Sequence, residues 1–300
     1  METRLRIDLP PGYRTADVLA FHGRDAEGVA EQVDGNGLRK AVLLDGVPTL
    51  FEIAFDARGA GCRIVSETVT MPDRARFHDV LLNILGLRID PAAFAALARD
   101  DAWLGPVIAR QPGLRIVQSA TVFEALTWAI IGQQINLTFA IALRRTLVLQ
   151  AGRLHASGLW CYPEARDVAR LDMEQLTSRK FSHAKADTIL RVARMVEDGA
   201  LSLDRARDPD VVGQELLAIK GIGPWTVNYI LLRGYGYPDC SLQGDVAVRT
   251  ALQRVSGSAE RPTLAQADRL LERYAPHRTM AAAYLWASLA EPPPAPAGHA

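Results

Sequence analysis

Apolar positions alternate with charged ones in the first part of the chain. Leu5, Ile7 and Leu9 follow this period of two, which is typical of a strand with one buried face. Two runs rich in apolar residues follow at 40–46 and 49–69, and a pair of glycines divides the second run into a predicted hairpin. The pattern therefore predicts a small antiparallel sheet.

The pattern becomes helical from Asp73 onward. Asp90 is a good N-cap, and Pro91 occupies the first helical position that follows it. Residues 120–254 are almost entirely helix-like segments separated by Gly, Asn and Asp-Pro breaks, and 276–290 reads as another helix. Strands first and helices later predict an α+β fold and argue against a βαβ nucleotide-binding fold. The sequence also lacks a strand-linked GxGxxG and a GxxxxGK[ST] motif.

Composition narrows the class of protein. The chain has 300 residues, of which 49% are hydrophobic, so it can bury a sizeable core. No apolar run is long enough to span a bilayer, and no apolar stretch follows the N-terminus, so we expect a cytoplasmic protein without membrane contact. The three cysteines are far apart, which predicts reduced thiols and excludes a disulfide framework, a zinc pair or a four-thiolate cluster: Cys62, Cys161 and Cys240.

A helix is broken and restarted within the segment 217–236. Asp208-Pro209 opens the first helix, the Gly-Ile-Gly stretch stops it, and Pro224 starts the second. The amides of this turn and of the new helix point outward, and with the positive helix end they form a potential anion site. Such a site needs no net positive charge, which suits a chain with 34 Lys+Arg and 34 Asp+Glu. The potential anion site includes Lys220, Gly221 and Gly223.

The second helix has two apolar faces. Val227, Ile230 and Leu231 form one face, which can pack on the first helix. Trp225 and Tyr229 lie on the roughly opposite face, together with Leu232. A short glycine turn joins many helix pairs that bind nothing, and a Trp–Tyr pair at this spacing is by itself more typical of a core than of a pocket.

Several motifs together resemble the helix-hairpin-helix DNA glycosylase superfamily, and most of all its bacterial 3-methyladenine DNA glycosylase II branch. The resemblance is strongest over residues 110–255. It rests on 112-PGLRI-116, 123-FEALTWAIIGQQINLTFA-140, 221-GIGPWTVNY-229, 231-LLRGYG-236, 237-YPD-239, and Asp245 within 244-GDVAVR-249.

The resemblance makes Asp245 the catalytic carboxylate. Breaking an N-glycosidic bond develops positive charge on the sugar, and a fixed carboxylate in a dry site stabilises that charge and can orient or deprotonate water. Asp245 also precedes an apolar periodic helix, so the residue taken alone reads as an N-cap. The two roles can coexist, because the start of a rigid helix holds a carboxylate still.

Trp225 bears on the type of glycosylase. In bifunctional members of the superfamily a lysine occupies this hairpin position and attacks the sugar, which requires an amine. Tryptophan cannot do this chemistry, and Lys220 lies on the other side of the hairpin. The resemblance therefore predicts a monofunctional enzyme that removes the base and leaves the backbone intact.

The resemblance also implies a base pocket and a DNA-contacting loop. Trp225, Tyr229 and Trp286 would receive the flipped base, which we expect to be an N-alkylated purine because its positive charge is attracted to aromatic faces. Trp286 alone also fits a helical core. Gln133 and Gln134 lie in the loop that enters the minor groove in the family. Gln134 replaces the leucine wedge of well-known bacterial members, and Lys185 can contact a DNA phosphate. The alternatives are structural: the two glutamines can form an ordinary polar loop between helices, and Lys185 can lie at a solvated helix start.

By resemblance, three lobes are expected. An N-terminal α+β lobe covers 1–88, a helical lobe with the helix-hairpin-helix covers 113–237, and 89–112 with 238–290 form a helical lobe that closes a cleft, before a disordered tail at 291–300. We expect a monomer acting on duplex DNA with damaged bases in the bacterial nucleoid. No cofactor, iron–sulfur cluster or metal is predicted, although an alkali cation at the hairpin carbonyls stays possible.

Two alternatives stay open from the sequence. The same fold can act on deaminated or oxidised bases, since pocket shape decides the substrate. A non-catalytic helix-hairpin-helix protein could instead sense DNA distortion. Asp245 argues against it, because binding phosphate needs no buried acid.

Overall fold

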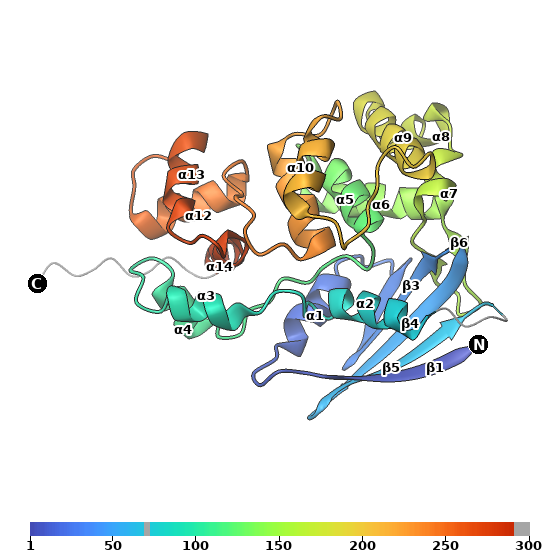
Figure 1. Ribbon diagram of the computed structural model, residues 1–300, viewed down its shortest axis with the longest axis horizontal. Helices are drawn as coiled ribbons and strands as arrows, with labels where there is room; N and C mark the ends of the chain where they lie inside the picture. The colour runs from blue at the N-terminus through green and yellow to red at the C-terminus, as the bar shows by residue number, and fades with distance from the viewer. Residues whose placement is uncertain (69–72, 291–300) are drawn as a thin grey trace, which may run out of the picture. The chain divides into compact units, whose positions relative to one another are not determined.

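The computed structural model describes residues 1–68 and 73–290 of the chain. The tail at 291–300, which the sequence predicts to be disordered, lies outside these residues. Two compact units divide the chain (Figure 1). The first unit contains residues 1–88 and 117–236, and the second contains 89–116 together with the chain from 237 onward. The three-lobe division stays a prediction.

A five-stranded antiparallel sheet occupies the N-terminal part of the first unit. Its strands lie in the order β1-β5-β4-β3-β2, and every neighbouring pair is antiparallel. The predicted hairpin is the β4–β5 pair, and its two glycines lie inside β5 instead of in the turn. The strands are β1 (Glu2–Asp8), β2 (Glu31–Asp34), β3 (Gly37–Leu44), β4 (Val47–Asp56) and β5 (Gly59–Ser66). The predicted α+β fold with an antiparallel sheet is confirmed.

Helices make up the rest of the first unit. They are α1 (Thr15–His22), α2 (Arg74–Ile84), α5 (Val122–Gly132), α6 (Leu137–Ala151), α7 (Ala165–Ala169), α8 (Met173–Thr177), α9 (His183–Glu197), α10 (Pro209–Leu217), α11 (Pro224–Ile230) and the π-helical turn η1 (Leu231–Tyr235). A two-stranded ribbon joins α6 to α7, from β6 (Arg153–Leu154) and β7 (Trp160–Cys161). Helix α5 is buried along almost its whole length and contacts α6, α9, α11 and η1.

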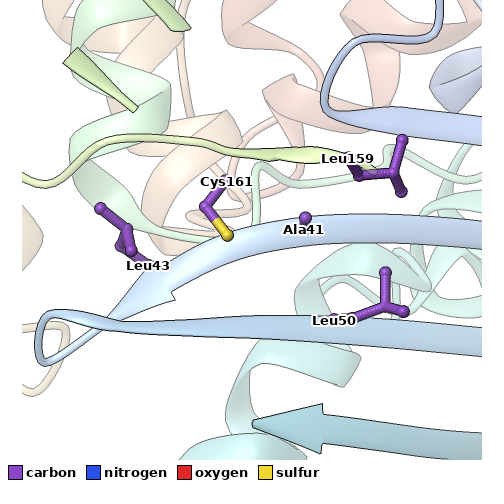
Figure 2. Close-up of a cluster of buried hydrophobic side chains, with 5 residues drawn as sticks. All are labelled: Ala41, Leu43, Leu50, Leu159 and Cys161. Atoms are coloured by element: carbon purple, nitrogen blue, oxygen red, sulfur yellow. The ribbon is translucent and has the colours of Figure 1, made fainter. Parts of the chain in front are cut away.

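Strand β7 of the ribbon and the residues beside it extend the sheet along the edge of β3. Ala41 and Leu43 of β3 and Leu50 of β4 pack with Leu159 and Cys161 in a buried apolar cluster (Figure 2). A backbone hydrogen bond from the amide of Leu43 to the carbonyl of Tyr162, 3.1 Å long, extends the pairing of β3. Burial raises the pKa of the Cys161 thiol to about 12, which keeps it protonated.

The face of the sheet that is turned toward α5 carries charged as well as apolar side chains. Lys40 of β3 is only 1% exposed, and its Nζ donates to Glu31 Oε2 at 2.7 Å and to Glu124 Oε1 at 2.9 Å. Arg144 Nη2 reaches the same two carboxylates, at 3.2 Å from Glu31 Oε1 and 2.7 Å from Glu124 Oε1. His22 Nδ1 lies 2.8 Å from Glu31 Oε2. This group of five residues is called the buried ion network below.

The buried ion network joins five elements of the first unit, α1, β2, β3, α5 and α6. Burial alone would raise the pKa of Glu31 and Glu124, but Lys40 and Arg144 hold both pKa values below the ordinary range. Glu124 Oε2 also accepts a hydrogen bond from the amide of Ala120, 3.0 Å away. Because Glu124 belongs to α5, the network ties the sheet to the helix that ends at the predicted DNA-contacting loop.

The second unit is helical in its described part. Its helices are α3 (Pro91–Leu97), α4 (Gly105–Arg110), α12 (Val246–Ser256), α13 (Leu264–Glu272) and α14 (Arg278–Leu289). Helix α14 is the centre and contacts the other four. Phe94 stacks on Tyr284 at 5.6 Å between ring centroids and meets Tyr274 edge-on at 5.9 Å.

Helix starts agree with the sequence prediction. Asp90 caps α3 by accepting a hydrogen bond from the amide of Ala92 at 3.0 Å, and Asp208 caps α10 through the amide of Asp210 at 2.8 Å. Asn136 caps α6 through the amide of Phe139 at 2.9 Å. Within the described residues, no helix is both long and apolar enough to cross a bilayer, and all three cysteines are free and buried.

Replacing Lys40 with Met should strongly destabilise the protein. The substitution removes one of the cations that balance the buried negative charges of Glu31 and Glu124. Breaking a buried ion pair in this way costs about 3–5 kcal/mol. Arg39→Met is the matched control, because its side chain points to the opposite face and is 37% exposed beside Glu52. Urea unfolding of both variants checks this: equal midpoints for the two would contradict the assigned role of the network.

Candidate active site

The hairpin of α10 and α11 is built as the glycine pattern predicts. Gly221 has φ +94°, and a Cβ atom there would lie 2.3 Å from Thr188 Oγ1 of α9. Position 221 therefore requires glycine twice, for its backbone conformation and for its close contact with α9. Position 223 differs: φ is −106°, and a Cβ atom added at that glycine would have no heavy atom within 4 Å. Contacts within the protein therefore do not require a glycine at position 223.

The two faces of α11 pack as the sequence predicts. Gly213 of α10 lies against Val227 and Leu231, since a Cβ at Gly213 would be 3.4 Å from Val227 Cγ1 and 3.7 Å from Leu231 Cδ1. On the other face, the rings of Trp225 and Tyr229 lie 5.1 Å apart at 31°. This second face turns toward α5.

Tyr229 belongs to a larger aromatic group that also holds two arginines. Trp128 Nε1 donates to the Tyr229 hydroxyl at 3.4 Å. The Arg24 guanidinium carbon lies 3.7 Å from the centre of the Phe21 ring and 5.5 Å from that of Trp128. The Arg233 guanidinium carbon lies 4.9 Å from the Phe21 ring and 5.6 Å from the Tyr229 ring.

The pKa of Tyr229 is shifted in an unusual direction for a buried tyrosine. Burial alone would raise the pKa of Tyr229, but Arg233 and Arg24 outweigh it, and the pKa of the phenol is lowered. Burial lowers the pKa of Arg24 to about 10, which still leaves the guanidinium charged at neutral pH. The face of α11 that carries Tyr229 therefore lies in a positive field.

Gln133 connects the loop after α5 to the hairpin. Its side-chain Nε2 donates to the carbonyl of Gly221 and to Thr226 Oγ1, both at 2.9 Å. Lys185 of α9 donates from Nζ to the carbonyl of Gln133 at 2.5 Å and of Ile130 at 3.2 Å. Burial lowers the pKa of Lys185. The sequence predicts DNA contact for both residues, which stays a prediction; the structure gives them a further role in fixing the loop.

Gln134 is held at the outer end of the same loop. It is exposed and has φ +57°, an uncommon conformation for a residue other than glycine. Leu137, three residues on, is 54% exposed at the first position of α6. The loop thus presents a polar and an apolar side chain to the outside.

In the second unit, Asp245 caps α12. Its Oδ1 accepts hydrogen bonds from the amide of Val248 at 2.9 Å and from Trp286 Nε1 at 3.2 Å. The side chain of Trp286 comes from α14, and both residues are half-buried. A helix N-terminus and an indole N–H together fix the orientation of this carboxylate.

The start of α14 is clamped to the turn that precedes Asp245. Arg278 donates to Asp239 from Nε at 2.8 Å and from Nη2 at 2.7 Å. Thr279 Oγ1 donates to the carbonyl of Tyr237 at 2.8 Å and accepts from the amide of Cys240 at 2.9 Å. The YPD turn of the sequence resemblance is therefore anchored on the helix that supplies Trp286.

The described residues hold no group of three or more His, Cys, Asp or Glu that could bind a metal ion. At the hairpin, the carbonyl of Lys220 accepts a hydrogen bond from Arg191 Nη1 at 3.0 Å, and that of Gly221 accepts from Gln133. An alkali cation at these carbonyls stays a prediction.

The structure groups the predicted site residues by unit. Trp225, Tyr229, Gln133, Gly221 and Lys185 share the first unit and are linked by the contacts above. Asp245 and Trp286 meet in the second unit. The lysine of the turn, Lys220, is exposed, and its assignment to DNA stays a prediction.

Four side chains at Tyr229 were missed by the sequence analysis: Phe21, Arg24, Trp128 and Arg233. Arg233 follows Tyr229 by four residues, about one helical turn, so its spacing was an available signal. Arg24 and Phe21 carry no such signal, because they reach Tyr229 from a segment some 200 residues away in sequence.

Comparison with known proteins places this geometry in a family. Residues 127–277 match the family described as HhH-GPD superfamily base excision DNA repair protein. The chain is 31% identical over 205 residues to the DNA-3-methyladenine glycosylase of Bacillus subtilis (strain 168), covering 66% of this chain and 67% of that protein. The first curated relatives are matched over 65% and 67% of their lengths.

Solved structures share the fold. The 3-methyladenine DNA-glycosylase from Archaeoglobus fulgidus superposes with a TM-score of 0.80 at 23% identity, over 94% of this chain and 97% of that one. The 8-oxoguanine glycosylase/lyase of Clostridium acetobutylicum, solved with double-stranded DNA, gives 0.71 at 16% identity, over 87% and 88%.

Replacing Lys185 with Met should loosen the loop at Gln134. The ammonium group supplies two hydrogen bonds to the end of α5, and one hydrogen bond to a charged group contributes about 1.5–3 kcal/mol. Amide hydrogen exchange of residues 131–136 should therefore become about tenfold faster or more. Lys180→Met, at an exposed position just before α9, is the control; equal exchange in the two variants would show that Lys185 does not fix the loop.

Proposed function

Because the chain belongs to the HhH-GPD superfamily of base excision DNA repair proteins, we propose that it is a monofunctional DNA glycosylase that excises alkylated purines of the 3-methyladenine type from duplex DNA. Its relative in Bacillus subtilis is named for this activity. The proposal assigns chemistry at the sugar to Asp245 and recognition of the flipped base to the aromatic residues.

The observation that carries the proposal is the environment of Asp245. Two donors, the amide of Val248 at 2.9 Å and the indole of Trp286 at 3.2 Å, hold the same oxygen of its carboxylate. Departure of the base leaves positive charge on the sugar, and a preorganised carboxylate stabilises this charge without reorienting. The half-buried position of Asp245 strengthens the interaction, because charges interact more strongly away from water.

The absence of an amine at the hairpin position supports base removal without strand cleavage. Trp225 occupies that position and stacks on Tyr229 at 5.1 Å. A Schiff base requires an amine nucleophile, so tryptophan cannot form one. With Asp245 as the catalytic carboxylate, water is the nucleophile that attacks the sugar. The product is an abasic site in an intact strand.

Base recognition is assigned to the aromatic residues Trp225, Tyr229 and Trp286. An alkylated purine nucleoside carries positive charge, so its glycosidic bond breaks without a strong general acid. Aromatic rings provide stacking surfaces for a base that has left the duplex.

The partner in this proposal is duplex DNA. The Gly223 segment and the first turn of α11 present backbone amides, which suit a phosphate. The open space at Gly223 allows the phosphate to come close to the backbone. Gln133, fixed by the hairpin and by Lys185, holds Gln134 where it can fill the gap left by the flipped base.

Replacing Asp245 with Asn should abolish base release while keeping the fold. Asparagine caps helices as well as aspartate, so the thermal midpoint should change little. The loss of a preorganised charge should lower the single-turnover excision rate about 100-fold or more. The assay measures free methylated purines released from methylated duplex DNA, and strand breaks should appear only after hot alkali.

Asp208→Asn is the matched control, because Asp208 also caps a helix but lies on α10. Equal activity of the two variants would reject Asp245 as the catalytic carboxylate. Strand breaks without alkali would reject the monofunctional assignment. Tight DNA binding without release by the wild type would favour a non-catalytic role.

Replacing Gly223 with Ala should weaken DNA binding without harming the fold. Its φ of −106° suits alanine, and no protein atom would clash; the poorer N-cap offsets the entropic gain of alanine, so the free energy of unfolding should change by less than about 1 kcal/mol. The new methyl group would lie where a phosphate approaches, so the dissociation constant for an abasic duplex should rise about tenfold. Gly61→Ala, on the sheet, is the control; unchanged binding by Gly223→Ala would place the phosphate elsewhere.

A further inference from the structure

Gly132 is a glycine that neither its backbone conformation nor its packing requires. It is the last residue of α5, so its backbone is helical, and a side chain can be placed there without strain. A Cβ atom added at position 132 would lie 3.9 Å from Trp225 Cη2, which is an ordinary van der Waals contact. Because alanine forms helices better than glycine does, the glycine makes α5 slightly less stable.

The missing side chain of Gly132 points into open space beside the Trp225 ring. Apart from the chain neighbours of Gly132 and the backbone of its own helix, Trp225 Cη2 is the one described heavy atom within 4 Å of the added Cβ. Both residues are half-buried, so this space can be reached from outside the protein.

Helices α5 and α11 enclose an aromatic pair between them, and Gly132 lies at one end of it. At the other end, Trp128 Nε1 donates to the Tyr229 hydroxyl at 3.4 Å. Trp128 and Gly132 are one turn apart on α5, as Trp225 and Tyr229 are on α11, so both pairs face each other along adjacent helices. A tryptophan therefore fills the Tyr229 end, whereas a glycine leaves the Trp225 end open.

The backbone around Gly132 is held in place. Lys185 Nζ donates to the carbonyl of Ile130 at 3.2 Å and to that of Gln133 at 2.5 Å, on both sides of the glycine. Gln133 Nε2 in turn donates to the carbonyl of Gly221 in the hairpin at 2.9 Å. A methyl group at position 132 would therefore take its room from the open space, because the backbone is not free to move away.

This open space lies where the proposed function needs room. A base that has left the duplex is received by stacking on aromatic rings, and Trp225 has this role in the proposed function. A purine is flat and bicyclic, so one of its edges must pass the residue that borders the ring. Glycine allows another group to approach the backbone more closely than any other residue does.

We infer that Gly132 is a base-contacting residue, whose missing side chain leaves the room that an edge of the flipped purine occupies beside Trp225. This inference rests on the proposed glycosylase function and adds a residue to its base site. Gly132 takes no part in the chemistry at the sugar, so a substitution there acts through the fit of the base.

The test separates contact with the base from contact with the DNA backbone. Wild type, Gly132→Ala and Gly132→Ser are compared on two duplexes, one with a single 7-methylguanine and one with a tetrahydrofuran abasic-site analogue, which has no base. Single-turnover release of 7-methylguanine, corrected for spontaneous depurination, should fall about tenfold or more in Gly132→Ala, because one extra methyl group in a site shaped to its ligand has an effect of this size. The dissociation constant for the abasic duplex should keep its wild-type value.

Gly61→Ala is the matched control. Its added Cβ would lie 3.8 Å from the carbonyl of Ala54 on the sheet, which is also an ordinary contact, so release of 7-methylguanine should proceed at the wild-type rate. The thermal midpoint of Gly132→Ala should equal or exceed that of wild type, because alanine suits a helical backbone. Gly132→Ser serves if Gly132→Ala does not fold.

Slower release by a folded variant, with unchanged affinity for the abasic duplex, supports the inference. An unchanged rate in a folded variant overturns it. Weaker binding of the abasic duplex also overturns it, because position 132 would then contact the DNA backbone instead of the base. Wild type that binds the duplex and releases no base overturns the proposed function, and the inference falls with it.

Discussion

Lys40 joins two carboxylates that belong to different elements of the first unit, strand β2 and helix α5, and the spacing of sheet and helix depends on this contact. Its Nζ lies 2.7 Å from Glu31 on the neighbouring strand and 2.9 Å from Glu124 on α5. A charge buried to this degree persists only where its partners are fixed, so sheet and helix must keep one spacing. Glu124 lies in the first turn of the helix that carries Trp128 and ends at Gln133, so the sheet helps to place the aromatic group and the loop.

Helix ends do most of the positioning at the candidate site. Asp245 lies at the start of α12, Gly223 at the start of α11, and Gln133 at the end of α5. At a helix end the backbone groups lack partners within the helix, so they hold side chains and attract ions of the matching sign. Lys185 at the carbonyls of α5 and Trp286 at the carboxylate of Asp245 then fix these ends from neighbouring helices.

Much of the fold and part of the candidate site could be predicted from local patterns. The strand alternation, the hairpin at residues 47–66 and the caps Asp90 and Asp208 agree with the structure, because each depends on residues only a few positions apart. The family was likewise predicted correctly from its motifs. The prediction that the two glycines form the β4–β5 turn was wrong, because they lie within β5. A Cβ atom at Gly59 would approach the Ile7 carbonyl of β1.

Local patterns in the sequence specify the order of strands and helices, the broken helix at Gly221, the cap at Asp245 and the aromatic face of α11. Which charged side chains meet depends instead on how whole elements pack. This packing brings Lys40 to Glu124, Lys185 to Gln133, and Arg24 to the aromatic group at Tyr229. Hydrophobic period and capping act over a few residues and leave a trace in the sequence. A contact across 84 residues, like that of Lys40 and Glu124, arises from packing of whole elements and leaves no periodic trace.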